Sequence, residues 1–208
     1  MARHDALFVA VGKGKRNDVQ ALVQALLGQG VPAEEILMDT MIPAMRDVGE
    51  KFSRNEVYVP EMLIAARAMQ AGLTILEPIL ARKGHQPIAK VCVGTVKGDL
   101  HDIGKNLVVM MLKGAGYEVI DLGVDCGVEK FEQAVGQGAR VVLCSALLTT
   151  TMPYMKQVVE HFRGRAGVQV VVGGAPVTQQ YAQEIGAHGY GSDANDAVRV
   201  VERLLGRG

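Results

Sequence analysis

The hydrophobic residues of this chain follow two different spacings, one before and one after about residue 85. In the first part, apolar positions recur every three or four residues, which is the spacing of amphipathic helices. Pro43 should bend one of these helices, because a proline removes a backbone donor and crowds the preceding turn. The pattern predicts a four-helix bundle, with a short helix before Gly12 and longer helices at about 16–29, 32–52 and 59–80.

In the second part, apolar runs rich in β-branched residues alternate with helical stretches. The runs lie at 88–96, 118–122, 140–147 and 168–172, and the helical stretches at 103–115, 128–137, 153–164, 177–185 and 194–205. This alternation predicts right-handed crossovers and a parallel, doubly wound sheet. The expected fold class is therefore α/β, with a four-helix bundle in residues 1–85 and a flavodoxin-like or Rossmann-like domain in residues 86–208. A polar segment containing Gly and Pro at 82–87 is the expected linker.

The composition of the chain argues against several classes of function. The 22 basic residues balance 22 acidic ones, so no net positive field points to nucleic acid or to an anionic membrane. No stretch approaches the roughly 20 apolar residues that cross a bilayer, and the polar N-terminus lacks a secretory signal. Cys92, Cys126 and Cys144 are scattered, which argues against a disulfide framework and against a zinc site built mainly of cysteines. A cytoplasmic protein is expected.

The loop after the first predicted strand carries the first candidate chemistry. Ligands on a doubly wound sheet bind at the carboxyl ends of the strands. Here Asp99 lies two positions before His101, and the glycine patterns of dinucleotide and P-loop sites are absent. A metal-binding imidazole usually gives its second N–H to a carboxylate, so His101 is a candidate ligand with Asp99 as its partner. By itself, a lone loop histidine is more often a surface or capping residue.

His101 and Asp102 also match the His-Asp pair of metal-dependent phosphohydrolases. Those enzymes hold their metals with further His and Asp residues spread over a helical domain. In this chain the pair follows a strand, and the remaining histidines are scattered. We therefore reject this alternative.

Two later features strengthen the metal-ligand interpretation. Ser145-Ala-Leu147 ends the third predicted strand, and Gly173-Gly174 ends the fourth, where bare backbone could face a large planar ligand. Each feature alone is equally a strand end or a turn. Together with Asp99-x-His101-x-x-Gly104, spaced by 40 and then 25 residues, they resemble the signature of cobalamin-binding domains. Methionine synthase, the carbon-skeleton mutases and the corrinoid proteins of methyltransferase systems share such domains.

The N-terminal part carries a second resemblance. The segments Val48-Gly-Glu-Lys-Phe52 and Val57-Tyr-Val-Pro-Glu61 are similar to the helical cap of methionine synthase and of methanogen and acetogen corrinoid proteins. The resemblance covers nearly the whole chain. It identifies the chain as a corrinoid protein of methyltransferase systems, with cobalamin or a related corrinoid, and hence cobalt, as cofactor.

The resemblance implies a role for individual residues. His101 would displace the cofactor's own lower base and bind cobalt, a mode called base-off/His-on. Asp99 would hydrogen-bond the other ring nitrogen, and Thr151 would complete the relay at a position where relatives often have Ser. The residues expected around the cofactor are Val96, Gly98, Asp102 and Ile103 at the corrin's lower face; Gly104 of the motif; Ser145, Leu147, Thr149, Gly173, Gly174, Gly191 and Ala194 along the nucleotide tail; and Phe52 and Val59 at the upper face.

The implied function is a non-catalytic carrier. Such a protein moves a methyl group on cobalt between a substrate-specific methyltransferase and an acceptor methyltransferase that uses tetrahydrofolate or a similar carrier. A reductive activator is a further expected partner, whereas nucleic acid and membrane are not. Two alternatives stay open: a cobalamin-dependent regulator, which usually has an added DNA-binding domain, and a mutase small subunit, which generally lacks the helical cap.

Overall fold

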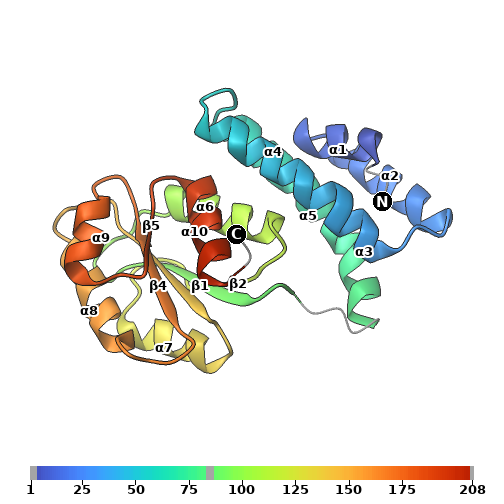
Figure 1. Ribbon diagram of the computed structural model, residues 1–208. Coiled ribbons are helices and arrows are strands. Elements are labelled where there is room, and N and C mark those ends of the chain that lie inside the picture. The colour runs from blue at the N-terminus through green and yellow to red at the C-terminus, as the bar shows by residue number, and fades with distance from the viewer. Residues whose placement is uncertain (1–3, 83–86, 207–208) are drawn as a thin grey trace. The chain divides into compact units, whose positions relative to one another are not determined.

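The structure is a computed structural model that describes residues 4–82 and 87–206. It divides into two compact units, a helical unit that extends to Pro87 and takes in Lys113–Gly116, and an α/β unit formed by the rest (Figure 1). Of the predicted linker at 82–87, residues 83–86 lie outside the described residues. The predicted fold class is confirmed, with helices first and a parallel sheet after them.

The helical unit contains the four predicted helical stretches. They are α1 (Asp5–Gly12), α2 (Arg16–Gly28), the run formed by α3 (Ala33–Glu35), η1 (Ile36–Met41) and α4 (Ile42–Ser53), and α5 (Val59–Arg82). The disturbance expected at Pro43 takes the form of η1, a π-helical segment directly before the first turn of α4. Because Pro43 has no backbone N–H, the α-helical hydrogen-bond pattern cannot run unbroken through it.

Helix α5 forms the centre of the helical unit. Its buried face includes Met62, Met69 and Leu76. A Cβ at Gly72 would lie 2.4 Å from Met41 Cε and 3.1 Å from a methyl of Val19, so the glycine lets these side chains pack directly on the helix. Among the described residues, α5 alone has the length and hydropathy of a membrane span, but 50% of that window is buried, as in a core helix.

The α/β unit is built on a five-stranded parallel sheet in the order β2-β1-β3-β4-β5. The strands are β1 (Lys90–Thr95), β2 (Glu118–Asp121), β3 (Val141–Ser145), β4 (Gln169–Gly173) and β5 (Gly189–Gly191). The fifth strand was not predicted, because it has only three residues and two of them are glycine. Strand order reverses direction between β1 and β3, and this is where ligands bind on such sheets.

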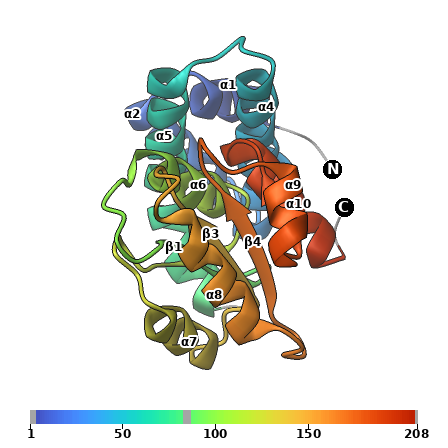
Figure 2. The same cartoon turned by 90° about the vertical axis from the view of Figure 1, so that its left-hand side faces the viewer.

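Helices cover both faces of this sheet. They are α6 (Ile103–Gly114), α7 (Val128–Gly136), α8 (Met152–Phe162), α9 (Gln179–Ile185) and α10 (Ala194–Leu204). Figure 1 shows α6 and α10 on one side and α7 and α8 on the other, and Figure 2 shows α8 across the strands. The core under α7, α8 and α9 includes Phe131, Met155 and Phe162, all fully buried.

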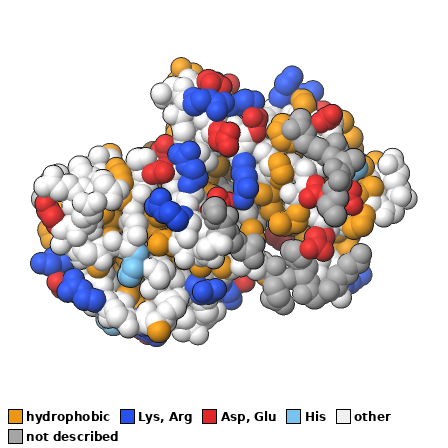
Figure 3. All heavy atoms as spheres, viewed as in Figure 1, with side chains coloured by type: hydrophobic (Ala, Val, Ile, Leu, Met, Phe, Trp, Pro, Cys, Tyr) orange, Lys and Arg blue, Asp and Glu red, His pale blue; other side chains and the backbone are white. Residues whose placement is uncertain are grey.

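Charged side chains of both signs are distributed over the surface. In Figure 3, acidic and basic groups are interspersed on the visible face, in keeping with 22 basic and 22 acidic residues in the chain. Such a mixed surface creates no extended field of one sign.

Candidate functional site

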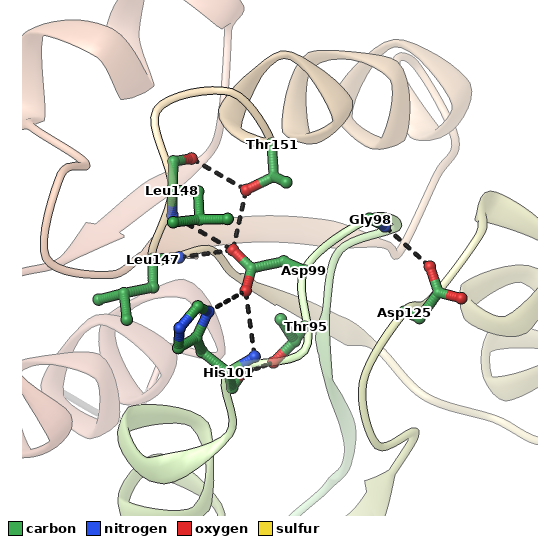
Figure 4. Close-up of polar contacts among 8 residues, drawn as sticks. All are labelled: Thr95, Gly98, Asp99, His101, Asp125, Leu147, Leu148 and Thr151. Atoms are coloured by element: carbon green, nitrogen blue, oxygen red, sulfur yellow. Dashed lines mark hydrogen bonds and ion pairs between the residues drawn. The ribbon is translucent and has the colours of Figure 1, made fainter.

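A buried carboxylate, that of Asp99, organises the loop between β1 and α6 (Figure 4). Its Oδ1 accepts from the backbone N–H of His101 at 3.1 Å and lies 2.7 Å from His101 Nδ1. Its Oδ2 accepts from the N–H groups of Leu147 and Leu148, at 2.8 and 3.3 Å, and from the Thr151 hydroxyl at 2.8 Å. The sheet thus brings together Asp99, His101 and Thr151, which are up to 52 residues apart in the sequence.

These hydrogen bonds keep the Asp99 carboxyl group ionised. Burial by itself would raise the pKa of Asp99, but the bonds from the Leu147 N–H, from His101 and from Thr151 hold this pKa well below its ordinary value. An ionised carboxylate can only accept, so Nδ1 of His101 must be the donor. The neutral ring then carries its lone pair on Nε2, on the side away from Asp99.

His101 is exposed, and its own loop and the loop after β3 carry exposed apolar side chains. Its side chain is 51% exposed. Leu100 and Ile103, its near neighbours in sequence, are 73% and 76% exposed, and Leu147 and Leu148 are also exposed. These four are the exposed large hydrophobic residues of the α/β unit in the part of the chain that the structure describes. A ring nitrogen with a free lone pair beside such a surface fits an apolar group that contains a metal.

Gly104 supports the same fit. A Cβ at this position would have no atom within 4 Å beyond its chain neighbours and the nearby backbone of its own helix, so packing in the chain does not require a glycine here. The residue is exposed, as are Asp102 and Ile103 before it. The missing side chain therefore leaves room at the surface next to His101.

The glycines of the predicted tail site are explained by the fold itself. A Cβ at Gly174, whose φ is +132°, would lie 1.9 Å from the carbonyl oxygen of Ala146. A Cβ at Gly173 would lie 2.8 Å from the carbonyl oxygen of Gly191, and one at Gly191 would lie 2.9 Å from Ala197 Cβ. Close approach of neighbouring chain segments thus requires these three glycines, whatever ligand they face.

The other predicted residues differ in exposure. Ser145 and Thr151 are half-buried, Thr149 is exposed, and Ala194 is buried at the start of α10. Val96 differs from the expectation, because its side chain is fully buried in the core under α7 and α8 and not on an exposed surface.

The two predicted upper-face residues belong to the helical unit. Phe52 lies near the end of α4 and Val59 begins α5, and both are half-buried. They therefore flank the connection between these two helices. Cys126, which was given no function, is a buried thiol that donates to the Leu122 carbonyl at 3.2 Å.

Four residues that the sequence analysis missed also fix this loop. The buried Thr95 donates its hydroxyl to the His101 carbonyl at 2.8 Å. Lys105, whose side chain is 2% exposed, contacts Asp121 at the end of β2 at 2.5 Å. Asp125 accepts from the Gly98 N–H at 2.8 Å. A lysine on the buried side of a helix was a usable signal, whereas the partners of the other residues depend on the fold.

Sequence comparison with known proteins agrees with this geometry. Two family models, both described as a B12 binding domain, match residues 89–199 and 3–77. The chain is 37% identical over 214 residues to a corrinoid protein of Desulfitobacterium hafniense, covering 100% of this chain and 99% of that protein. It is 40% identical over 185 residues to the trimethylamine corrinoid protein of Methanosarcina barkeri, covering 86% of this chain and 85% of that protein.

Two solved structures share the fold over nearly the whole chain. A chain of the methanol:cobalamin methyltransferase complex from Methanosarcina barkeri has a TM-score of 0.84 and 27% identity, covering 98% of this chain and 79% of that chain. A cobalamin-binding protein from Desulfitobacterium hafniense has a TM-score of 0.79 and 28% identity, covering 96% and 97%. The cofactor of this protein is cobalamin or a related corrinoid, and the chain belongs to the B12-binding family of corrinoid proteins.

Proposed function

We propose that this protein carries a methyl group on the cobalt of its corrinoid, which it binds base-off with His101 as the lower axial ligand. The observation that supports this most is the half-exposed His101 ring, whose Nδ1 is engaged by the buried carboxylate of Asp99. The corrinoid, when bound, supplies a cobalt centre that accepts and releases the methyl group. The chain itself binds, orients and shields it.

In this proposal each member of the relay has its own task. His101 would hold the cobalt through Nε2, because Nδ1 is engaged by Asp99. Asp99 would orient the ring and keep the proton at Nδ1. Thr151 would orient Asp99, because its hydroxyl contacts both Asp99 Oδ2 and the Leu148 carbonyl.

The remaining residues would bind the rest of the cofactor. We assign residues 86–208 to the cobalamin-binding domain and residues 1–85 to a cap domain, with the hinge in 82–87. The residues that would line the cofactor are Gly98, Asp102, Ile103 and Gly104 at the corrin; Ser145, Leu147, Thr149, Gly173, Gly174, Gly191 and Ala194 along the tail; and Phe52 and Val59 from the cap.

The partners follow from the same proposal. A relative of this chain is named for trimethylamine, and a similar chain belongs to a methanol:cobalamin methyltransferase complex. We infer that this protein docks with a substrate-specific methyltransferase, with an acceptor methyltransferase using tetrahydrofolate or a similar carrier, and with a reductive activator. Its three free, buried thiols suit the reducing cytoplasm.

The test is cobalt(II) spin resonance of the reduced holoprotein with ¹⁵N-labelled histidine and unlabelled cobalamin. Nitrogen from the protein then gives a doublet, whereas the cofactor's own base gives a triplet. We expect a doublet for the wild type and its loss in His101→Ala. A triplet in the wild type, or a doublet that persists in His101→Ala, would exclude His101 as the ligand.

Methyl carriage has a separate test. The reduced holoprotein is mixed with each candidate donor and its methyltransferase while the cobalt absorption spectrum is followed. We expect methylation with one pair and loss of the methyl group on adding an acceptor system. If the corrinoid binds but no donor pair methylates it, the carrier function is wrong.

A further inference from the structure

The turn that carries Asp99 is held from a second side, by the loop between β2 and α7. The Asp99 N–H donates to the Val96 carbonyl at 3.1 Å and closes a turn in which Gly98 has a φ of +83°. The Gly98 N–H donates to Asp125 Oδ1 at 2.8 Å (Figure 4). The Asp125 N–H donates to the Asp99 carbonyl at 3.1 Å. Asp125 thus bonds the peptide group before Gly98 through its side chain and the peptide group after Asp99 through its backbone N–H.

Asp125 holds an unfavourable backbone conformation to make these contacts. Its φ is +49°, and only Asn55 shares this sign among the non-glycine residues that the structure describes. Residues other than glycine rarely adopt a positive φ, so such a backbone conformation is found where other interactions compensate for its cost. The two hydrogen bonds to the turn are the compensation visible here.

The backbone of the β2–α7 loop is held by hydrogen bonds that do not involve the Asp125 carboxylate. The Thr95 N–H donates to the Gly123 carbonyl at 3.0 Å, and the Cys126 N–H donates to the Thr95 carbonyl at 2.9 Å. Asp125 itself is exposed, so its side chain fills no part of the core. The carboxylate can therefore be removed without unpacking the loop that bears it.

We infer that Asp125 is a positioning residue for the cobalt ligand, an inference that rests on the proposed role of His101. Asp99 is fixed at its side chain by Leu147, Leu148 and Thr151. Its carbonyl accepts from the Asp125 N–H, and the Asp125 carboxylate holds the preceding residue, Gly98. The His101 ring follows Asp99, because both its Nδ1 and its backbone N–H contact Asp99 Oδ1. Without the Asp125 carboxylate, the turn keeps its backbone bonds but loses the one to the Gly98 N–H, so the ring is held less firmly.

Three variants separate this role from a general effect on folding. Asp125→Gly removes the carboxylate and keeps the left-handed backbone, since glycine adopts positive φ without strain. Asp125→Asn keeps an oxygen that can accept from the Gly98 N–H. Asn55→Gly makes the matching change at the other left-handed residue, in the helical unit.

The measurement is the same ¹⁵N-histidine doublet in cobalt(II) spin resonance, with cobalamin as the probe. A net hydrogen bond corresponds to about a fivefold change in an equilibrium constant, so we expect about a fivefold lower ligation constant in Asp125→Gly. Asp125→Asn should recover most of the ligation, and Asn55→Gly should match the wild type. Circular dichroism of the apoprotein should be the same for all.

The outcomes distinguish the role of His101 as cobalt ligand from the role of Asp125 in positioning it. If the wild type lacks the doublet, the proposed function itself fails. If the wild type shows the doublet and Asp125→Gly shows it at the same strength, the role of Asp125 is overturned. The same holds if the Gly and Asn variants lose ligation equally, because the accepting oxygen would then be irrelevant.

Discussion

The β1–α6 loop and the two glycines at the end of β4, Gly173 and Gly174, belong to one sequence signature, but different interactions hold them in place. In the loop, side chains make hydrogen bonds to neighbouring backbone, as Asp99 does with Leu147 and Leu148. At Gly174, the backbone lies so close to the Ala146 carbonyl that no side chain fits. Side chains of the β1–α6 loop can therefore be substituted while the fold survives, whereas a side chain added at Gly174 would disrupt it.

The largest difference between the two regions is expected from alanine substitutions at two glycines of the signature. Gly174→Ala should destabilise the protein by about 3 kcal/mol or more, because the methyl group collides with the Ala146 carbonyl oxygen at a φ of +132°. Urea unfolding of the apoprotein measures this loss.

Gly104→Ala is the matched control. Its Cβ meets open space in the first turn of α6, so the apoprotein should gain up to about 1 kcal/mol from higher helix propensity. Corrinoid affinity should nevertheless fall, because the methyl group occupies the space next to His101. Equal stability of the two alanine variants would remove the distinction between the regions.

A smaller effect is expected at the ion pair beside the loop. Asp121→Ala should cost about 2–3 kcal/mol, because it leaves the buried Lys105 ammonium without its carboxylate. Lys105→Met should cost less, since Met fills a similar volume and Asp121 is 39% exposed to water. Chemical unfolding of both variants tests this order, and a larger loss in Lys105→Met would contradict it.

The smallest effect concerns the three buried thiols, of which Cys92 lies in β1, Cys144 in β3 and Cys126 in the loop after β2. Burial raises the pKa of Cys92 from 9.0 to about 12, and burial also raises the pKa of Cys126 and of Cys144. We expect no reaction with a thiol reagent at pH 8 until urea is added. An added surface thiol, Ser192→Cys, should react at once and serves as the positive control.

The same shifts have a consequence for stability at high pH. A folded-state pKa above the unfolded value means that the stabilisation is complete below about pH 9. It is lost as pH rises from there towards 12, because the unfolded chain ionises first. Urea midpoints that stay constant over this range would show that the thiols are not buried in solution.

Much of the architecture was predictable from local pattern. Helical spacing and β-branched runs are properties of short segments, so the bundle and four of the strands could be predicted. The fifth strand, Gly189–Gly191, could not, because two of its three residues are glycines and its pairing with β4 defines it. The π-helical form of residues 36–41 was also beyond the sequence, although the disturbance at Pro43 was not.

For the site, the sequence established which chemistry was available: an Asp two positions before a His, a later hydroxyl and the glycines of the signature. Which of these groups meet depends on how the chain folds. Asp99 receives the Thr151 hydroxyl from 52 positions away, and Gly98 bonds an Asp 27 positions away. Such bonds form because the carboxyl ends of parallel strands meet at one edge of the sheet, and no local pattern encodes that proximity.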